Sequence, residues 1–150
     1  MRSLHPNRRD TLLGALALGV AGLVPASALA SQPVRDRLMA FTGGATPQEG
    51  RVHLDLPQVA ENGEAVPLTV AVDSPMTDAD HVAEVLILAH ANPRPTVATF
   101  AFSPLSGRAE VTTRIRLADT QTVTAVARMS DGGLFMVRRE VIVTVGGCAG

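Results

Sequence analysis

The only cysteine of this 150-residue chain, Cys148, lies in the C-terminal sequence Gly146-Gly147-Cys148-Ala149-Gly150. Its neighbours are glycines and one alanine, which bury little apolar surface and leave the backbone free to turn. We therefore expect an exposed sulfur on a flexible C-terminal arm, residues 146–150. A thiolate is the nucleophile of sulfur exchange, so this residue offers covalent attachment of another sulfur atom. The alternative is a terminal remnant or a site of casual dimerisation.

The sequence around Cys148 contains no group that would activate its thiol. The nearest cationic residues along the chain are Arg138 and Arg139, and no histidine is closer. An enzyme nucleophile needs a neighbouring base or cation that favours the thiolate. We therefore favour a carrier thiol, activated inside another protein's pocket, over a catalytic cysteine.

The other residues that could do chemistry do not form a recognisable set. Three histidines lie too far apart in sequence for a metal-binding motif: His53, His81 and His90. Three carboxylates near a Ser-Pro turn lack the glycine and the terminal glutamate of an EF-hand loop, which favours a solvated turn over a calcium site: Asp73, Asp78 and Asp80. Two serines lie in a loop without a nearby histidine: Ser103 and Ser106. We predict no catalytic residue, no metal site and no cofactor, although the fold could still bring distant histidines together.

Residues 1–30 have the pattern of an export signal. The pair Arg8-Arg9 precedes an apolar stretch over residues 12–24, and small residues provide a cleavage site after Ala30. The stretch is shorter than the roughly 20 residues of a membrane-spanning helix, so we expect no membrane anchor after cleavage. The arginine pair is typical of a twin-arginine signal, which exports folded proteins. We predict a periplasmic protein that starts at Ser31.

The composition of the remaining chain indicates one folded domain, residues 31–145, followed by the arm. Its carboxylates outnumber its arginines and it has no lysine, so nothing suggests a nucleic-acid partner. It has four phenylalanines but neither tryptophan nor tyrosine. The core must therefore consist mainly of aliphatic side chains, and an aromatic platform for sugars or bases is not expected.

The hydrophobic pattern predicts an all-β fold with one short helix. Residues 34–41 show helical spacing and end at Gly43-Gly44, a plausible helix C-cap. Turn residues then separate seven β-branched runs, which is typical of an immunoglobulin-like antiparallel β-sandwich, with a small barrel as the alternative. The predicted strands are 52–56, 66–72, 82–90, 97–102, 109–117, 122–129 and 134–145.

One predicted strand is apolar on both faces. Residues 85–89 read Val-Leu-Ile-Leu-Ala, without the alternation of a half-exposed strand. Such a strand is central in its sheet or covered by a second subunit. The pattern therefore also suggests a dimer.

Four segments of the chain resemble the SoxY family, the sulfur-carrier subunits of the periplasmic thiosulfate-oxidising Sox system. They are residues 56–76, 92–100, 107–117 and 123–132. The terminal Gly146-Gly147-Cys148 motif makes the resemblance specific, and the similarity spans about residues 34–150. The family tail is typically Gly-Gly-Cys-Gly-Gly, whereas Ala149 follows the cysteine here.

The resemblance implies a carrier rather than an enzyme, with sulfur intermediates attached covalently to Cys148. It also implies a heterodimer with a SoxZ-like subunit, a second small β-sandwich. Further implied partners are a haem c protein that attaches thiosulfate, a hydrolase that removes sulfate and, in some systems, a sulfane dehydrogenase that oxidises the remaining sulfur.

Two other classes of protein fit parts of the pattern. An exported immunoglobulin-like structural or interaction module would use its terminal cysteine for a disulfide between molecules. A periplasmic metal-binding protein would use the scattered histidines.

Overall fold

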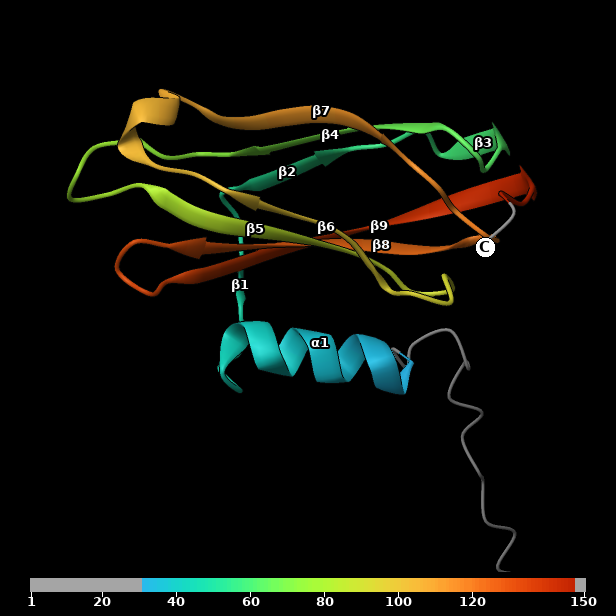
Figure 1. Cartoon of the computed structure of the whole chain (residues 1–150), viewed down its shortest axis with the longest axis horizontal. Helices are drawn as coiled ribbons and strands as arrows, with labels where there is room; N and C mark the ends of the chain where they lie inside the picture. The colour runs from blue at the N-terminus through green and yellow to red at the C-terminus, as the bar shows by residue number, and fades with distance from the viewer. Residues whose placement is uncertain (1–30, 148–150) are drawn as a thin grey trace, which may run out of the picture.

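Two β-sheets pack face to face, and one helix lies against the outer face of the larger sheet (Figure 1). The computed structural model describes residues 31–147. The helix is α1 (Gln32–Thr42). The larger sheet contains β1 (Gln48–Glu49), β9 (Leu134–Val145), β8 (Gln121–Met129), β5 (Val82–Ala89) and β6 (Thr96–Ala101) in that order, and β3 (Val59–Asn62) also pairs with β9. The smaller sheet contains β2 (Val52–Asp55), β4 (Val66–Val72) and β7 (Ala109–Ile115).

The predicted β-sandwich is confirmed, and each of the seven predicted runs contains a strand. Two short strands were not foreseen, because β1 has only two residues and β3 carries one buried side chain among four. Both pair with β9 in parallel, whereas β9 pairs with β8 in antiparallel fashion, so only these two short strands depart from the antiparallel pattern. A 3-10 turn, Pro104–Ser106, was also not foreseen.

The space between the sheets is filled by aliphatic side chains. In β4, the alternate residues Val66, Leu68, Val70 and Val72 are buried, while the residues between them face outward. This is the alternation expected of a strand with one solvated face. Val85, Ile87 and Ala89 of β5 supply the opposite side of the same core.

The outer face of β5 is buried by α1, which explains why this strand is apolar on both faces. Leu86 and Leu88 form a second small core with Val34 of the helix, and Leu38 and Phe41 pack against it. The strand is also central, because β8 and β6 pair with its two edges. Of the two explanations that the sequence left open, the central position is therefore confirmed, and within residues 31–147 this apolar face needs no second subunit to cover it.

Polar contacts also hold α1 on the sheet. Arg128 of β8 pairs with Glu84 of β5, and its guanidinium lies 4.8 Å from the centre of the Phe41 ring. The same arginine donates a hydrogen bond to the Phe41 carbonyl at 3.3 Å. The helix ends as predicted at Gly43, which adopts a left-handed conformation with φ of 64°.

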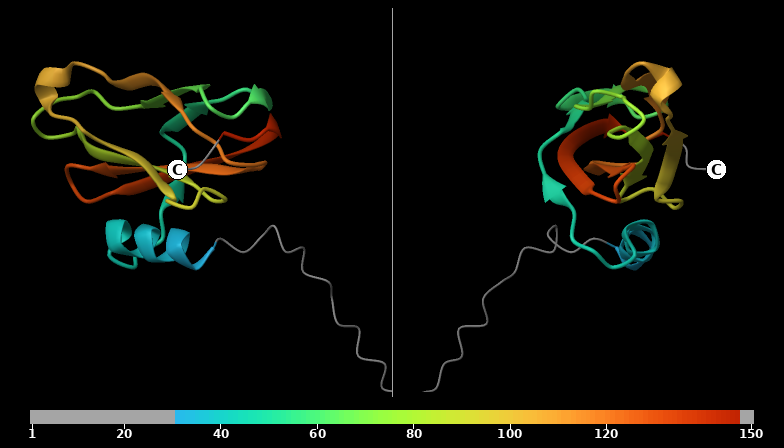
Figure 2. Two further views of the ribbon diagram at one scale, coloured as in Figure 1. Left: turned by 45° about the vertical axis from the view of Figure 1, so that its right-hand side comes forward. Right: turned by 90° about the vertical axis from the view of Figure 1, so that its left-hand side faces the viewer.

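The chain between α1 and β4 changes sheets twice. It pairs with β9 as β1, crosses to the smaller sheet as β2, and returns to β9 as β3. Figure 2 shows the segment from β1 to β2 running along one side of the sandwich. The return as β3 places residues 59–62 beside the C-terminal end of β9, directly before the glycine-rich tail.

Within residues 31–147, no helix is long and apolar enough to cross a membrane. The predicted signal peptide, residues 1–30, lies outside the described residues.

The packing of α1 gives a stability prediction. Replacing Val34, which is 1% exposed, with Ala should lower the free energy of unfolding by about 1–3 kcal/mol, because it removes two buried methyl groups between helix and sheet. The control is Met39→Ala on the same helix, which is 65% exposed and should change stability by less than about 0.5 kcal/mol. Urea denaturation of both variants measures the difference. Equal stability of the two would contradict the assigned packing.

Candidate functional site

The tail is still attached to the sandwich at Gly147, the last described residue before the cysteine. Its N–H donates to the carbonyl of Leu117 at 2.9 Å. Gly63 joins the same network, because its N–H donates to Val145 at 2.7 Å and its carbonyl accepts the N–H of Leu117 at 2.7 Å. The backbone of Gly63, Leu117 and Ala118 thus forms a surface, here termed the glycine notch, against which the tail rests.

The notch leaves no room for side chains on either partner. A Cβ on Gly63 would overlap the carbonyl oxygen of Leu117 and lie 2.7 Å from the nitrogen of Gly147. A Cβ on Gly147 would lie 2.7 Å from the carbonyl oxygen of Gly63, and one on Gly146 would overlap the carbonyl oxygen of Ala118. None of these three glycines has a positive φ. Close approach of two backbones, rather than an unusual backbone angle, is therefore the reason for glycine here.

The structure describes the first two residues of the predicted arm, Gly146 and Gly147. The sequence analysis placed Gly146 and Gly147 in a flexible segment directly after Val145. In the structure Gly147 is buried and hydrogen-bonded, while Gly146 is exposed but rests on Ala118. Cys148, Ala149 and Gly150 lie outside the described residues, so their exposure and flexibility remain predictions.

Asn92 and Gln121 hold the wall of the notch in place. The Asn92 amide donates to the carbonyl of Arg116 at 2.8 Å, and its oxygen accepts the N–H of Ala118 at 2.9 Å. The side chain of Gln121, a buried residue, donates to the same Asn92 oxygen at 2.9 Å. Residues 116–118 are thereby fixed on both sides of Leu117, the residue that accepts the tail hydrogen bond.

The notch also brings a cationic residue to the tail that sequence spacing could not reveal. Arg116 precedes Leu117, and its Cγ would lie 2.8 Å from a Cβ on Gly147. The side chain of an arginine thus passes beside the residue that precedes Cys148. Sequence analysis missed it because 32 positions separate Arg116 from the cysteine in the printed sequence.

The histidines do not assemble into a shared site. His53 pairs with Asp73 at 2.7 Å on the surface, and His81 contacts the carbonyl of Thr77 at 3.0 Å. His90 contacts the Thr124 hydroxyl at 2.8 Å, and burial, with a further contribution from Arg138, lowers its pKa below the ordinary value of 6.5. Among residues 31–147, no three His, Cys, Asp or Glu side chains are grouped so that they could hold a metal ion.

The carboxylates and serines named in the sequence analysis make separate local contacts and form no shared site. Asp80 pairs with Arg51 at 3.7 Å, whereas Asp73 is engaged with His53. Ser106 and Ser103 stabilise the 3-10 turn through a capping box.

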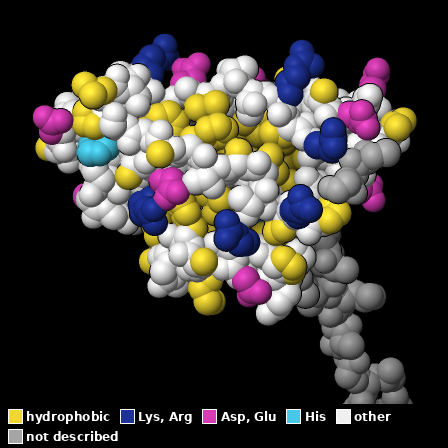
Figure 3. Space-filling model, viewed as in Figure 1, with side chains coloured by type: hydrophobic (Ala, Val, Ile, Leu, Met, Phe, Trp, Pro, Cys, Tyr) yellow, Lys and Arg dark blue, Asp and Glu magenta, His cyan; other side chains and the backbone are white. Residues whose placement is uncertain are grey.

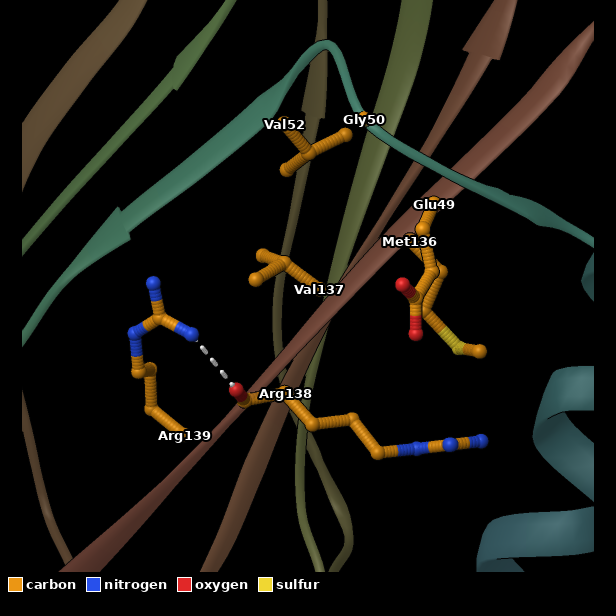
Figure 4. Close-up of a pocket in the computed structure, with 7 residues that line it drawn as sticks. All are labelled: Glu49, Gly50, Val52, Met136, Val137, Arg138 and Arg139. Carbon is orange, nitrogen blue, oxygen red and sulfur yellow. Dashed lines mark hydrogen bonds between the residues drawn. The ribbon is translucent and has the colours of Figure 1, made fainter.

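A pocket of about 450 Å³ lies between β2 and the first half of β9 (Figure 4). Figure 4 shows Arg138 and Arg139 pointing to opposite sides of β9, and Arg139 donates to the Arg138 carbonyl at 3.1 Å. The lining also includes the carboxylate of Glu49 and the apolar side chains of Val52 and Val137. Seven residues of extended chain separate Arg139 from Gly146, roughly 20 Å, so this pocket lies far from the tail.

The sequence of the chain was compared with models of known protein families to establish its family. A model of the family described as sulfur oxidation protein SoxY matches residues 38–148, which includes the terminal cysteine. The chain belongs to the SoxY family. This agrees with the resemblance seen in the sequence, and with a carrier rather than an enzyme.

Solved structures agree with the SoxY assignment. The sulfur carrier protein SoxY from Chlorobium limicola f thiosulfatophilum is 34% identical, with a TM-score of 0.62 over 75% of this chain and 97% of that protein. A superoxide reductase (neelaredoxin) from Ignicoccus hospitalis is 19% identical, with a TM-score of 0.56 over 63% of this chain and 80% of that protein. The second likeness shows a shared fold only. A comparison with curated proteins gave no match.

Proposed function

We propose that this chain carries sulfur intermediates of thiosulfate oxidation as covalent adducts of the Cys148 thiol. The observation that carries the proposal is the SoxY family match, which extends through residue 148 and so includes the only cysteine of the chain. The glycines before it support the same role, because a segment without side chains is thin enough to enter a narrow channel.

The chemistry of such a carrier needs partners to supply redox and hydrolytic power. Joining the Cys148 thiolate to the outer sulfur of thiosulfate forms a sulfur–sulfur bond and releases two electrons, which a haem c protein accepts. Attack of water on the terminal sulfonate then releases sulfate and two protons and leaves a persulfide on the cysteine. A hydrolase catalyses that step, and a sulfane dehydrogenase, where present, oxidises the persulfide sulfur further.

The charge of these adducts gives Arg116 a role. Both the thiosulfonate and the persulfide adduct are anionic, and a nearby guanidinium stabilises such groups through charge-assisted hydrogen bonds. The Cγ of Arg116 lies beside Gly147, which makes this arginine a candidate for that role in addition to the contact that it already makes within the chain. The groups that activate the thiol for reaction come mainly from the partner enzymes.

The alternative is an exported immunoglobulin-like module that uses Cys148 for a disulfide between molecules. The β-sandwich alone is compatible with both functions. The two are separated by whether the thiol turns over with thiosulfate or remains in a stable disulfide.

Replacing Cys148 with Ser should abolish thiosulfate oxidation in an assay reconstituted with the partner enzymes, because a hydroxyl does not form the sulfur–sulfur bond. The fold should be unchanged, as circular dichroism and thermal unfolding can check. The matched control is Ala149→Ser, which places the same hydroxyl on the adjacent residue and should retain activity. Full activity of Cys148→Ser, or turnover of thiosulfate by the protein alone, would contradict the proposal.

We also propose that the chain forms a heterodimer with a SoxZ-like subunit. The support is an open side of the sandwich, the β6–β7 seam, defined by Val97, Phe100, Phe102 and Val111. The strands β6 and β7 are edges of different sheets, and these four side chains pack on the core but remain partly exposed. Figure 3 views this side of the molecule and shows apolar side chains gathered between the two sheets. A permanent partner would bury such a seam.

Val111→Arg should weaken binding to the SoxZ-like subunit at least tenfold, because a charge in the centre of an apolar interface is costly to desolvate. Met39→Arg, at an exposed position of the helix that covers the outer face of the larger sheet, is the control and should bind like the parent protein. Calorimetric titration gives both affinities, and the melting temperature of each free variant verifies its fold. Unchanged binding by folded Val111→Arg would place the partner elsewhere.

Export to the periplasm by the twin-arginine route is proposed from the pair Arg8-Arg9. Changing both arginines to lysine should leave the precursor in the cytoplasm, which fractionation and immunoblotting would detect. Normal periplasmic accumulation of this variant would exclude a twin-arginine signal.

A further inference from the structure

We propose that the open edge of β9 between β1 and β3 binds a small tetrahedral oxyanion, which the guanidinium groups of Arg138 and Arg139 clamp from two sides. Sulfate and thiosulfate are ions of this class. The site lies in the pocket beside β2, and none of its residues belongs to the C-terminal tail. It is therefore a second site, separate from the carrier function proposed above.

The edge of β9 is unpaired where the pocket of Figure 4 lies. Among the described residues, β1 pairs with residues 135 and 136 of this strand, and β3 pairs with residues 142, 143 and 145. The chain between β1 and β3 crosses to the smaller sheet as β2. No strand of residues 31–147 therefore covers this edge over residues 137–141, and the gap opens into the pocket of about 450 Å³.

The backbone turns hydrogen-bond donors toward this gap. Successive N–H groups of a strand point to its two edges in turn. The N–H of Ile142 donates to the Gln58 carbonyl at 2.9 Å on the β3 side, so the N–H groups of Glu140 and Arg138 point to the same side. The Arg138 carbonyl also faces this edge, but it already accepts a hydrogen bond from the Arg139 side chain at 3.1 Å. The Arg138 N–H is thus left as a donor for an anion.

Two guanidinium groups flank this edge from opposite faces of the sheet. Figure 4 shows Arg138 and Arg139 on opposite sides of β9, as the alternation of a strand requires. Within residues 31–147, neither guanidinium forms an ion pair. Glu49 is the carboxylate of the pocket lining, so the two arginines give this lining a net positive charge. An anion at the edge therefore lies between two cations.

The arrangement favours a tetrahedral oxyanion over a planar carboxylate. Guanidinium groups form charge-assisted hydrogen bonds with both kinds of anion. A tetrahedral ion presents oxygens in several directions, so it can accept from the backbone N–H in the plane of the sheet and from the arginines above and below it. A carboxylate has both oxygens in one plane and satisfies fewer of these donors at once. Because both arginines are exposed, binding is weak and exchange with the solvent is fast.

NMR titration of the isotope-labelled chain with sodium sulfate, at an ionic strength held constant with sodium chloride, tests the site. The amide signals of Arg138 and Glu140 should shift along a saturation curve. Sodium thiosulfate should shift the same signals, whereas sodium acetate should shift them less. Absence of a saturable shift at these two amides, or equal shifts with acetate, would overturn the proposal.

Charge variants separate a clamp of two arginines from general attraction of anions to the surface. Arg139→Gln should weaken sulfate binding roughly fivefold, the upper range for one exposed charge pair, and Arg138→Gln should do the same. Glu49→Gln should tighten binding, because it removes the carboxylate of the lining. The matched control is Arg114→Gln, which changes an exposed arginine of β7 in the other sheet and should bind sulfate like the parent protein.

The melting temperature of each variant verifies its fold. Parent-like affinity of both folded pocket variants, or an equal loss of affinity in the control, would contradict the assigned site. None of these measurements depends on the thiol of Cys148. The oxyanion site and the carrier function, which the Cys148→Ser assay tests, therefore succeed or fail separately.

Discussion

The contact between the backbones of Gly63 and Gly147 is the constraint on which the placement of the tail depends. Two chains approach so closely there that a single methyl group on either would collide with a carbonyl or a nitrogen. The contact exists because β3 returns to the end of β9 and because Asn92 holds residues 116–118 from the other side. A strand pairing and a side-chain amide, both distant in sequence from the C-terminus, thus determine where the carrier segment begins.

The root of the tail, residues 146–147, and the sandwich are held by different kinds of interaction. A hydrogen bond contributes about 0.5–1.5 kcal/mol net, and fixing the backbone of a residue costs about 1–2 kcal/mol. One hydrogen bond does not by itself offset the ordering of two glycines, so the position of Gly147 also depends on its packing against Gly63 and Leu117, whereas the sandwich is fixed by a continuous aliphatic core. The helix α1 covers Leu86 and Leu88, so the outer face of β5 is not available to a partner, and we assign the partner subunit to the β6–β7 seam.

The sequence predicted the sandwich well because its signals are local. Alternation in residues 66–72, the glycine at the end of α1, and the turn residues between strands each act within a few positions, and the structure confirms them. Residues 85–89 were correctly predicted to be buried on both faces of their strand. The sequence did not show that α1 buries the outer face, because about forty positions separate the helix from this strand. Asn62-Gly63 is one of the turn pairs that separate the predicted strands, here 52–56 from 66–72. The pair indicated a turn, which exists, but the close approach of Gly147 to Gly63 and the position of Arg116 depend on tertiary structure alone.

Covalent carriage of sulfur on Cys148 is the central claim, and intact-mass spectrometry of the protein isolated from cells oxidising thiosulfate tests it most directly. The account predicts a mixture of masses that exceed the unmodified chain by sulfur-containing groups, all removed by a thiol reductant and all mapped by peptide analysis to the fragment that contains Cys148. Isolation of only the unmodified chain or its disulfide dimer under these conditions, or adducts on any other residue, would contradict it.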